Sequence, residues 1–237
     1  MAIALLVTFL TITAPARLLP LVMPSDLVFD GMTGTLWRGS AARSVVLVQQ
    51  KRVALGETRW QLDPWSLATL RPRLTFETVW GGQSLSGRVA FDVSGRVALD
   101  NVEARLTVDF LRQLIPLYVG GRLDGRLARV EIDRDGSVRA RGRVDWLGAA
   151  WKSAAGDVRL GNYRLDITSD EGRTLGRVTT LEGPLQVAGD LTLANARYAI
   201  NLDLSGPGTR NQALVDAFQL LASPTARGYE IMLSGNL

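Results

Sequence analysis

Four acidic residues gathered in the middle of the chain are the first candidates for chemistry. They are Asp124, Glu131, Asp133 and Asp135. Paired carboxylates can act as general acid and base in a hydrolase, and the "DRDG" at 133–136 resembles the start of a calcium loop. A calcium loop needs further oxygen ligands and a closing Glu, whereas Val138 and Arg139 follow here. We therefore expect a β-turn at this place and no metal site.

Other catalytic groups are scarce in the sequence. The chain has no histidine and no cysteine, which removes Ser-His-Asp triads, thiolate nucleophiles and the usual zinc ligands. The "GPGTRNQ" at 206–212 precedes a predicted helix but lacks the lysine of a phosphate-binding loop. The sequence predicts a protein that is not an enzyme and has no cofactor.

The basic residues are scattered and do not form a cluster. The net charge is +4 with a sequence pI near 9.9, and the arginines alternate with acids, as in "GRLDGRLARVEIDRDG". A nucleic-acid-binding surface would concentrate its positive charge. We expect a solvated sheet face and no nucleic-acid partner.

The segments that carry these charges have the two-residue period of β-strands. In "SVRARGRVDW" the even positions Val138 to Trp146 are apolar or glycine, while Arg139, Arg141 and Arg143 occupy the other face. Similar alternation occurs around residues 89–93, 104–108, 198–204 and 229–233. The predicted fold is all-β and mainly antiparallel, a strongly twisted or curved meander sheet with a few short helices and an N-terminal transmembrane helix.

Glycine and proline mark the predicted turns and helix ends. Turns are expected at 93–96, 133–137, 159–163 and 181–184. Short helices are expected in "DPWSLATL" from Asp63, "DFLRQLIP" from Asp109 and "GTRNQALVDAFQLLA" from Gly208. No βαβ rhythm is visible, which argues against a parallel sheet.

The N-terminal segment is apolar and supports two interpretations. Residues 2–23 are about as long as the ~20 residues of a membrane-spanning helix, and Arg17 is their only charge. Alternatively, Ala14, Pro15 and Ala16 form an A-x-A pattern typical of a signal-peptide cleavage site. We favour an uncleaved anchor over residues 1–24, followed by a β-rich domain over residues 25–237.

The stretch "GMTGTLWRGSA" at 31–41 reads as one early strand bent at its glycines. Alternation along such a strand puts Thr35 and Trp37 on one face and Leu36 and Arg38 on the other. We expect Trp37 to be substantially buried, so that Trp37→Ala costs about 3–5 kcal/mol. For the six tryptophans of the chain, filling a core is the default role.

Several motifs in order resemble the type II secretion system protein N family. They are "GMTGTLWRGSA", "RWQLDPWSL", "GRVDWLGAAW", "RLGNYRLDI" and the terminal "LLASPTARGYEIMLSGNL". The residues that match family motifs are Gly34, Thr35, Leu36, Trp37, Gly39, Trp60, Pro64, Trp146, Gly161 and Tyr163. Arg38 stands where the family often has glutamine.

The resemblance implies a single-pass protein of the bacterial inner membrane with most of its chain in the periplasm. It implies an accessory, non-catalytic scaffold or assembly role in the export of folded proteins across the outer membrane, with other inner-membrane components of that machinery as partners. It supplies no catalytic, cofactor or metal residues. The alternative is a lipid-binding or lipid-transfer module with an apolar β-groove, similar to AsmA-like proteins.

Overall fold

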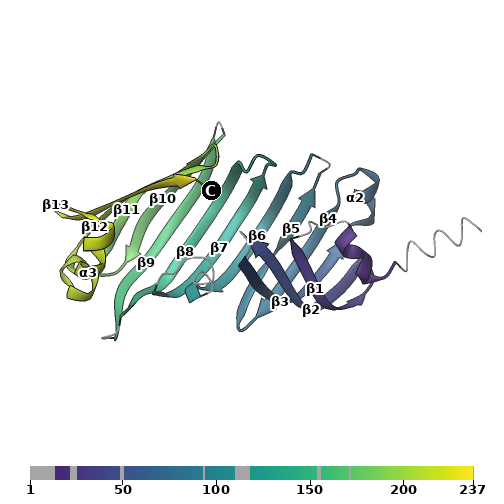
Figure 1. Cartoon of the computed structure of the whole chain (residues 1–237), viewed down its shortest axis with the longest axis horizontal. Coiled ribbons are helices and arrows are strands. Elements are labelled where there is room, and N and C mark those ends of the chain that lie inside the picture. The colour runs from purple at the N-terminus through teal and green to yellow at the C-terminus, as the bar shows by residue number, and fades with distance from the viewer. Residues whose placement is uncertain are drawn as a thin grey trace, which may run out of the picture. The chain divides into compact units, whose positions relative to one another are not determined.

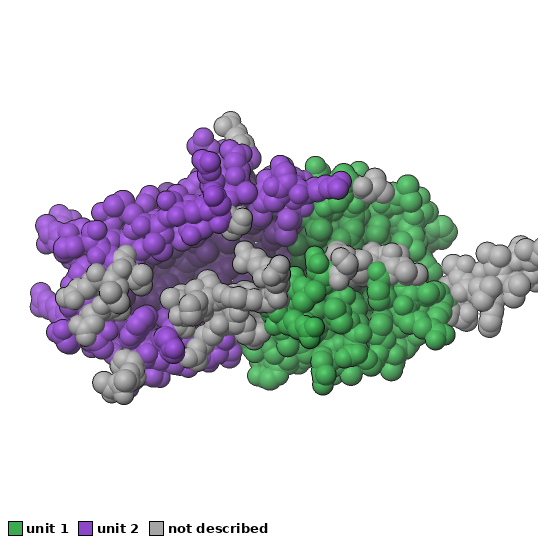
Figure 2. Space-filling model, in the orientation of Figure 1, with its two compact units in different colours: residues 1–99 green, residues 100–237 purple. Residues whose placement is uncertain are grey.

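The computed structural model describes residues 14–21, 26–48, 51–92, 94–109, 118–153, 156–170 and 172–236. The chain forms two compact units, unit 1 over residues 1–99 and unit 2 over residues 100–237. Figure 1 traces their strands and Figure 2 colours the two units separately. Each unit is described by itself below.

Unit 1 is built from an antiparallel meander in which each strand pairs with the next. Its elements are η1 (Ala16–Leu21), β1 (Leu27–Gly34), β2 (Arg38–Val48), β3 (Lys51–Leu62), α2 (Pro64–Ala68), β4 (Arg73–Trp80) and β5 (Gln83–Phe91). The division between the units falls within β6 (Val97–Thr107).

Unit 2 is also an antiparallel meander, and its first strands are longer than those of unit 1. Its elements are β7 (Val119–Ile132), β8 (Val138–Ser153), β9 (Gly156–Asp170), β10 (Arg173–Glu182), β11 (Gln186–Ala194), β12 (Arg197–Ser205), η3 (Pro207–Arg210), α3 (Gln212–Leu221), β13 (Ser223–Thr225) and β14 (Gly228–Asn236). The order β7 to β12 follows the chain, and β14 then lies between β12 and β13. The expectation of an all-β antiparallel meander is confirmed within each unit.

Most of the predicted turns and helices are confirmed. The turn at 133–137 joins β7 to β8, the turn at 181–184 joins β10 to β11, and α2 and α3 begin behind the caps Asp63 and Asn211. The predicted helix after Asp109 lies outside the described residues, apart from its first residue. The predicted turn at 159–163 is wrong. Gly161 is a buried, positive-φ residue inside β9, where the register shifts beside β8, so this glycine marks a bulge and not a turn.

The stretch at 31–41 is a hairpin and not one strand. β1 ends at Gly34 and β2 begins at Arg38, and the Thr35 N–H donates to the Arg38 carbonyl at 2.9 Å to close the turn. The turn breaks the alternation on which the prediction for Trp37 rested. Leu36 is therefore buried, while Trp37 is half-buried and packs at the side of the core.

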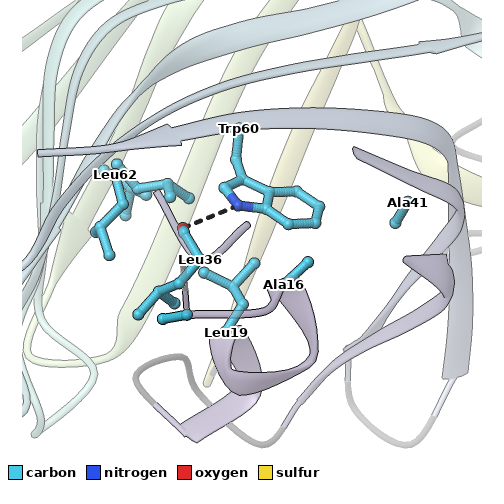
Figure 3. Packing of buried hydrophobic residues seen from close by; sticks show 9 residues of the cluster. Ala16, Leu19, Leu36, Ala41, Trp60 and Leu62 are labelled. Carbon is cyan, nitrogen blue, oxygen red and sulfur yellow. Dashed lines mark hydrogen bonds between the residues drawn. The ribbon is translucent and has the colours of Figure 1, made fainter. Parts of the chain in front are cut away.

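The core of unit 1 includes part of the apolar N-terminal segment. Leu19 on η1 is fully buried and Ala16 nearly so, in one cluster with Leu36, Trp60 and Leu62 (Figure 3). The Leu36 N–H donates to the Ala14 carbonyl at 2.7 Å. Within the predicted anchor, residues 16–21 form a 3-10 helix that covers apolar side chains of the meander, a role that alternation within the strands could not reveal.

The rest of the predicted anchor, residues 1–13 and 22–24, lies outside the described residues. Among the residues that the structure describes, no helix has the length and apolarity needed to span a bilayer. The anchor over the first residues stays a prediction.

The core of unit 2 lies at one end of its sheet, beneath α3. Leu214 and Phe218 of α3 pack against Leu204 and Tyr229, with Phe218 and Tyr229 ring centroids 4.9 Å apart. Helical spacing of i and i+4 places both α3 side chains on one face of the helix, as the sequence predicts. This helix covers only part of the apolar face of unit 2.

Trp60 is the central aromatic of unit 1 and gives a direct test of this packing. Its side chain is 3% exposed and its indole N–H donates to the Leu36 carbonyl at 3.2 Å. We expect Trp60→Ala to lower the free energy of unfolding by about 3–5 kcal/mol. Trp37→Ala should cost clearly less because Trp37 is only half-buried. Denaturant titration of both variants checks this, and an equal or larger loss for Trp37→Ala would contradict it.

Candidate functional site

The motif residues of unit 1 form one packed cluster around Trp60. Gly39 lies on β2 opposite Trp60 on β3. A β-carbon at Gly39 would lie 2.5 Å from the Trp60 ring and 2.6 Å from the Thr33 carbonyl oxygen, so only glycine leaves room for the indole. Gly39 of "TLWRG" and Trp60 of "RWQLDP" therefore pack directly against each other.

The neighbouring motif residues close the hairpin and start the helix. Gly34 has φ 88°, a left-handed conformation that favours glycine, and a β-carbon there would meet the Arg38 carbonyl oxygen at 2.6 Å. The Trp37 carbonyl accepts from the Leu62 N–H at 2.8 Å. Pro64 is the first residue of α2, where its missing N–H costs no hydrogen bond. These residues fix backbone geometry.

The motif residues of unit 2 form a second cluster. The rings of Trp146 and Tyr163 are paired across β8 and β9, with centroids 5.7 Å apart. The Trp146 indole N–H donates to the Gly120 carbonyl at 3.1 Å, and the Tyr163 hydroxyl donates to the Leu185 carbonyl at 2.9 Å. Burial raises the pKa of the Tyr163 hydroxyl to about 12. Both polar groups are therefore occupied by the backbone and are not free for a ligand.

The sequence motif residues thus fall into two clusters, one in each unit. Each cluster joins neighbouring strands through aromatic packing and side-chain bonds to carbonyl oxygens. Trp65, which flanks the same corner as Trp60, is 83% exposed. The predicted role as structural family markers fits these positions, and the arrangement offers no nucleophile or base.

The "DRDG" segment is a β-turn whose carboxylates accept hydrogen bonds from within the turn. The Gly136 N–H donates to the Asp133 carbonyl at 3.0 Å. The Ser137 hydroxyl and N–H donate to Asp135 at 2.7 and 2.9 Å. These bonds lower the pKa of the Asp135 carboxyl, the hydroxyl having the largest effect. Among the described residues no group of three acidic side chains converges on a point where a metal ion could sit.

The charges of unit 2 lie on one face of its sheet and are paired between neighbouring strands. Arg139 reaches Glu131 at 2.9 Å, and the hydrogen bond from Arg129 is the main reason that the pKa of Glu131 is lowered. Further pairs between strands are Arg143–Asp166, Arg164–Asp145 and Arg177–Asp190. Opposite charges on adjacent strands stabilise the strand register, which is the role that these acids have here.

Among the residues that the structure describes, the opposite face of unit 2 is apolar and incompletely covered. The side chains that face this side on β8 to β12 are mostly half-buried, among them Val144, Leu165, Ile167, Leu191 and Ile200. Figure 2 shows the surface of unit 2 hollowed on one side. The sequence predicted the alternation but could not predict how much of this face stays open, because that depends on what packs over it.

A hollow of about 470 Å³ opens on strands β6 to β9 of unit 2. Three consecutive residues of each strand line it, and Leu127, Gly142 and Ile167 lie at its centre in one cross-strand row. A β-carbon at Gly142 would lie 2.8 Å from Leu127 Cδ2, so the leucine side chain packs over the glycine. The hollow is thus suited to an apolar group, and this open surface is the candidate functional site.

Comparisons with known proteins agree on one family. The family model described as type II secretion system (T2SS), protein N, matches residues 26–231. The chain is 27% identical to the type II secretion system protein N of Aeromonas hydrophila, covering 93% of this chain and 89% of that protein. It is 26% identical to the protein of the same name from Vibrio cholerae, covering 94% and 90%. No solved structure matches the chain.

The pair Asp145–Arg164 tests the role of the charged face. Arg164 donates two hydrogen bonds to Asp145, at 2.7 and 3.0 Å, and both side chains are less than a third exposed. The hydrogen bond from Arg164 is the main cause of a lowered pKa of Asp145. We expect Asp145→Asn to lower the free energy of unfolding at pH 7 by about 1 kcal/mol.

The sign of the pH dependence follows from the lowered pKa. The stabilisation by Asp145 is present above about pH 4, the pKa of an unfolded Asp, and is lost as the pH falls through the lower folded value. The difference between wild type and Asp145→Asn should therefore shrink in acid. Asp190→Asn, from the well-exposed pair with Arg177, is the control and should cost less than about 0.5 kcal/mol. Equal effects of the two variants would contradict this account.

Proposed function

Because the chain belongs to the type II secretion system protein N family, we propose that it is a non-catalytic scaffold or assembly component of the type II secretion machinery. In this role it supports the export of folded proteins across the outer membrane. It is held in the inner membrane by its N-terminal residues, with the bulk of the chain in the periplasm. Its partners are other inner-membrane components of the machinery.

The observation that carries this proposal is the family match over residues 26–231, which includes nearly all of the described strands. The scaffold role is supported by how the polar groups are used. Carboxylates such as Asp145 and Glu131 are bound to arginines across the sheet, and the hydroxyl of Tyr163 is bound to a backbone carbonyl. These polar groups hold the strands together, which fits a sheet whose surface serves as a scaffold.

The experiment is a deletion of the gene in its native host, with export of a folded substrate of the system as the readout. We expect export to fall and to be restored by the wild-type gene. Asp145→Asn and Glu131→Gln should restore export in proportion to the amount of folded protein, because neither carboxylate takes part in chemistry. Unchanged export in the deletion strain, or loss of export by either variant at a full level of folded protein, would overturn the proposal.

A lipid-binding role is the second candidate, and the open apolar face of unit 2 favours it. Half-buried side chains such as Leu127 and Ile167 line a hollow of about 470 Å³, which is the size range of sites for small apolar ligands. In this role the sheet holds lipid acyl chains on its apolar face while the charged face stays in water.

Photo-crosslinking in cells tests the lipid role. A photoreactive amino acid at Leu165 should yield lipid adducts detectable by mass spectrometry of the purified protein. The control is the same amino acid at Arg177, which is exposed on the charged face of the neighbouring strand β10 and should yield none. Adducts at neither position, or equally at both, would contradict this role.

A further inference from the structure

The last long strand of unit 2 has an open edge. β14 pairs with β12 along almost its whole length, but β13 covers its other side only at Gly228, Tyr229 and Glu230. In the described part of the chain, no strand pairs with the outer side of 231–236. Figure 1 shows the short β13 at this end of the sheet. An edge of this kind is able to accept another strand.

The register shows which backbone groups the edge presents. Pro224 of β13 lies opposite Tyr229 and has no N–H to donate, so the bonded pairs to β13 are those of Gly228 and Glu230. Bonded residues alternate along an antiparallel strand. The N–H and carbonyl groups of Met232, Ser234 and Asn236 therefore point away from β12, toward an incoming strand.

The side chains along the edge define what an added strand must carry. Leu233 and Ile231 lie in rows with Ile200 and Leu202 of the apolar face. Met232 lies on the charged face and is 62% exposed, while Leu233 is 45% exposed. An added strand with alternating apolar and polar side chains would continue both faces and cover part of the exposed apolar area.

The charges next to the edge favour a basic partner. Asp203 of β12 lies directly opposite Glu230 of β14, and neither carboxylate forms an ion pair in the described part of the chain. Like charges in this position destabilise a sheet. Asp124 and Asp145 also lie opposite each other, but each of those carboxylates is bound by an arginine. The uncompensated acids at the edge lack a cation.

A second copy of the chain does not supply that cation. Its other free edge strand, β1, has Asp30 as its only charged residue, and its own β14 would bring another Glu230. Neither strand has an arginine or lysine that could neutralise Asp203 and Glu230. The charge pattern thus argues for a different protein.

We propose that the open edge of β14, residues 231–236, receives an extended strand of a partner protein, which has alternating apolar side chains and an arginine or lysine placed beside Glu230. Backbone bonds to Met232 and Ser234 fix the strand, and its apolar side chains extend the row of Ile231 and Leu233. This inference rests on the edge geometry and the charges and does not depend on the proposed secretion role.

The test measures binding of defined peptides to the full chain purified in detergent, by fluorescence anisotropy. The probe is a short peptide of alternating valine and threonine with one arginine on its polar side. The amides on the edge that faces away from β14 are N-methylated so that the peptide does not self-associate. We expect saturable binding. A matched peptide with glutamate in place of arginine should bind about threefold more weakly, and Glu230→Gln should remove that difference.

Proline at the edge tests the backbone bonds. Met232→Pro removes an outward N–H without touching the bonds to β12 and should weaken binding about tenfold. Met232→Thr, which keeps the N–H, is the control and should bind nearly as well as wild type. If Met232→Pro does not fold, a peptide N-methylated on its pairing edge makes the same test on the unchanged protein and should not bind.

Three outcomes would overturn the proposal. The first is equal binding of both peptides to the wild-type chain. The second is undiminished binding to a folded Met232→Pro variant or by the peptide N-methylated on its pairing edge. The third is a dimer of the chain that Met232→Pro dissolves, which would show that a second copy occupies the edge.

Discussion

The structure depends on the two-residue alternation of its antiparallel strands, which gives each sheet one charged face and one apolar face. In unit 2 the charged face is stabilised by pairs such as Arg164–Asp145 and Arg143–Asp166, which join directly opposed residues. The apolar face has no such pairs. Its side chains stabilise the protein only when other groups cover them and remove them from water. What covers that face therefore decides what the protein can bind.

Among the described residues, two elements cover apolar side chains of the strands. In unit 1, η1 places Leu19 against the cluster around Trp60. In unit 2, α3 places Leu214 and Phe218 over one end of the sheet. Side chains away from α3, such as Val144 and Leu191, stay half-buried. A sheet with this remaining open surface is suited to hold a partner or a lipid, and the family places it in a machine that exports proteins.

The sequence predicted the elements whose signals are local. Alternation in β8, the cap and proline of α2 and the glycine turn at 133–137 are encoded within a few residues, and the structure agrees with each. The predictions of one continuous strand at 31–41 and of a turn at 159–163 are wrong for a shared reason. Leu36 faces the core because Thr35 closes a hairpin, and Gly161 lies in a strand because neighbouring strands pair on both of its sides. A local sequence pattern contains no information on how strands that are distant in the chain pair with one another.

The motif residues show the same limit. The order of the motifs identified the family, but only the structure explains why Gly39 and Trp60 occur together, since the indole occupies the space of the missing side chain. The open edge of β14 had no sequence signal of its own, because an edge is defined by the absence of a neighbouring strand in the described part of the sheet. Its uncompensated pair, Asp203 and Glu230, is visible only once the register is known.

Whether the apolar face of unit 2 is open can be measured by thiol labelling, because the chain has no cysteine of its own. Single cysteines at Val144, Leu165 and Ala149 in lipid-stripped protein would be treated with a maleimide under native conditions. The account predicts labelling of the folded protein at Val144→Cys and Leu165→Cys, and labelling at the fully buried Ala149 position only after unfolding. Protection of all three cysteines until unfolding would show that the face is closed and would contradict the account.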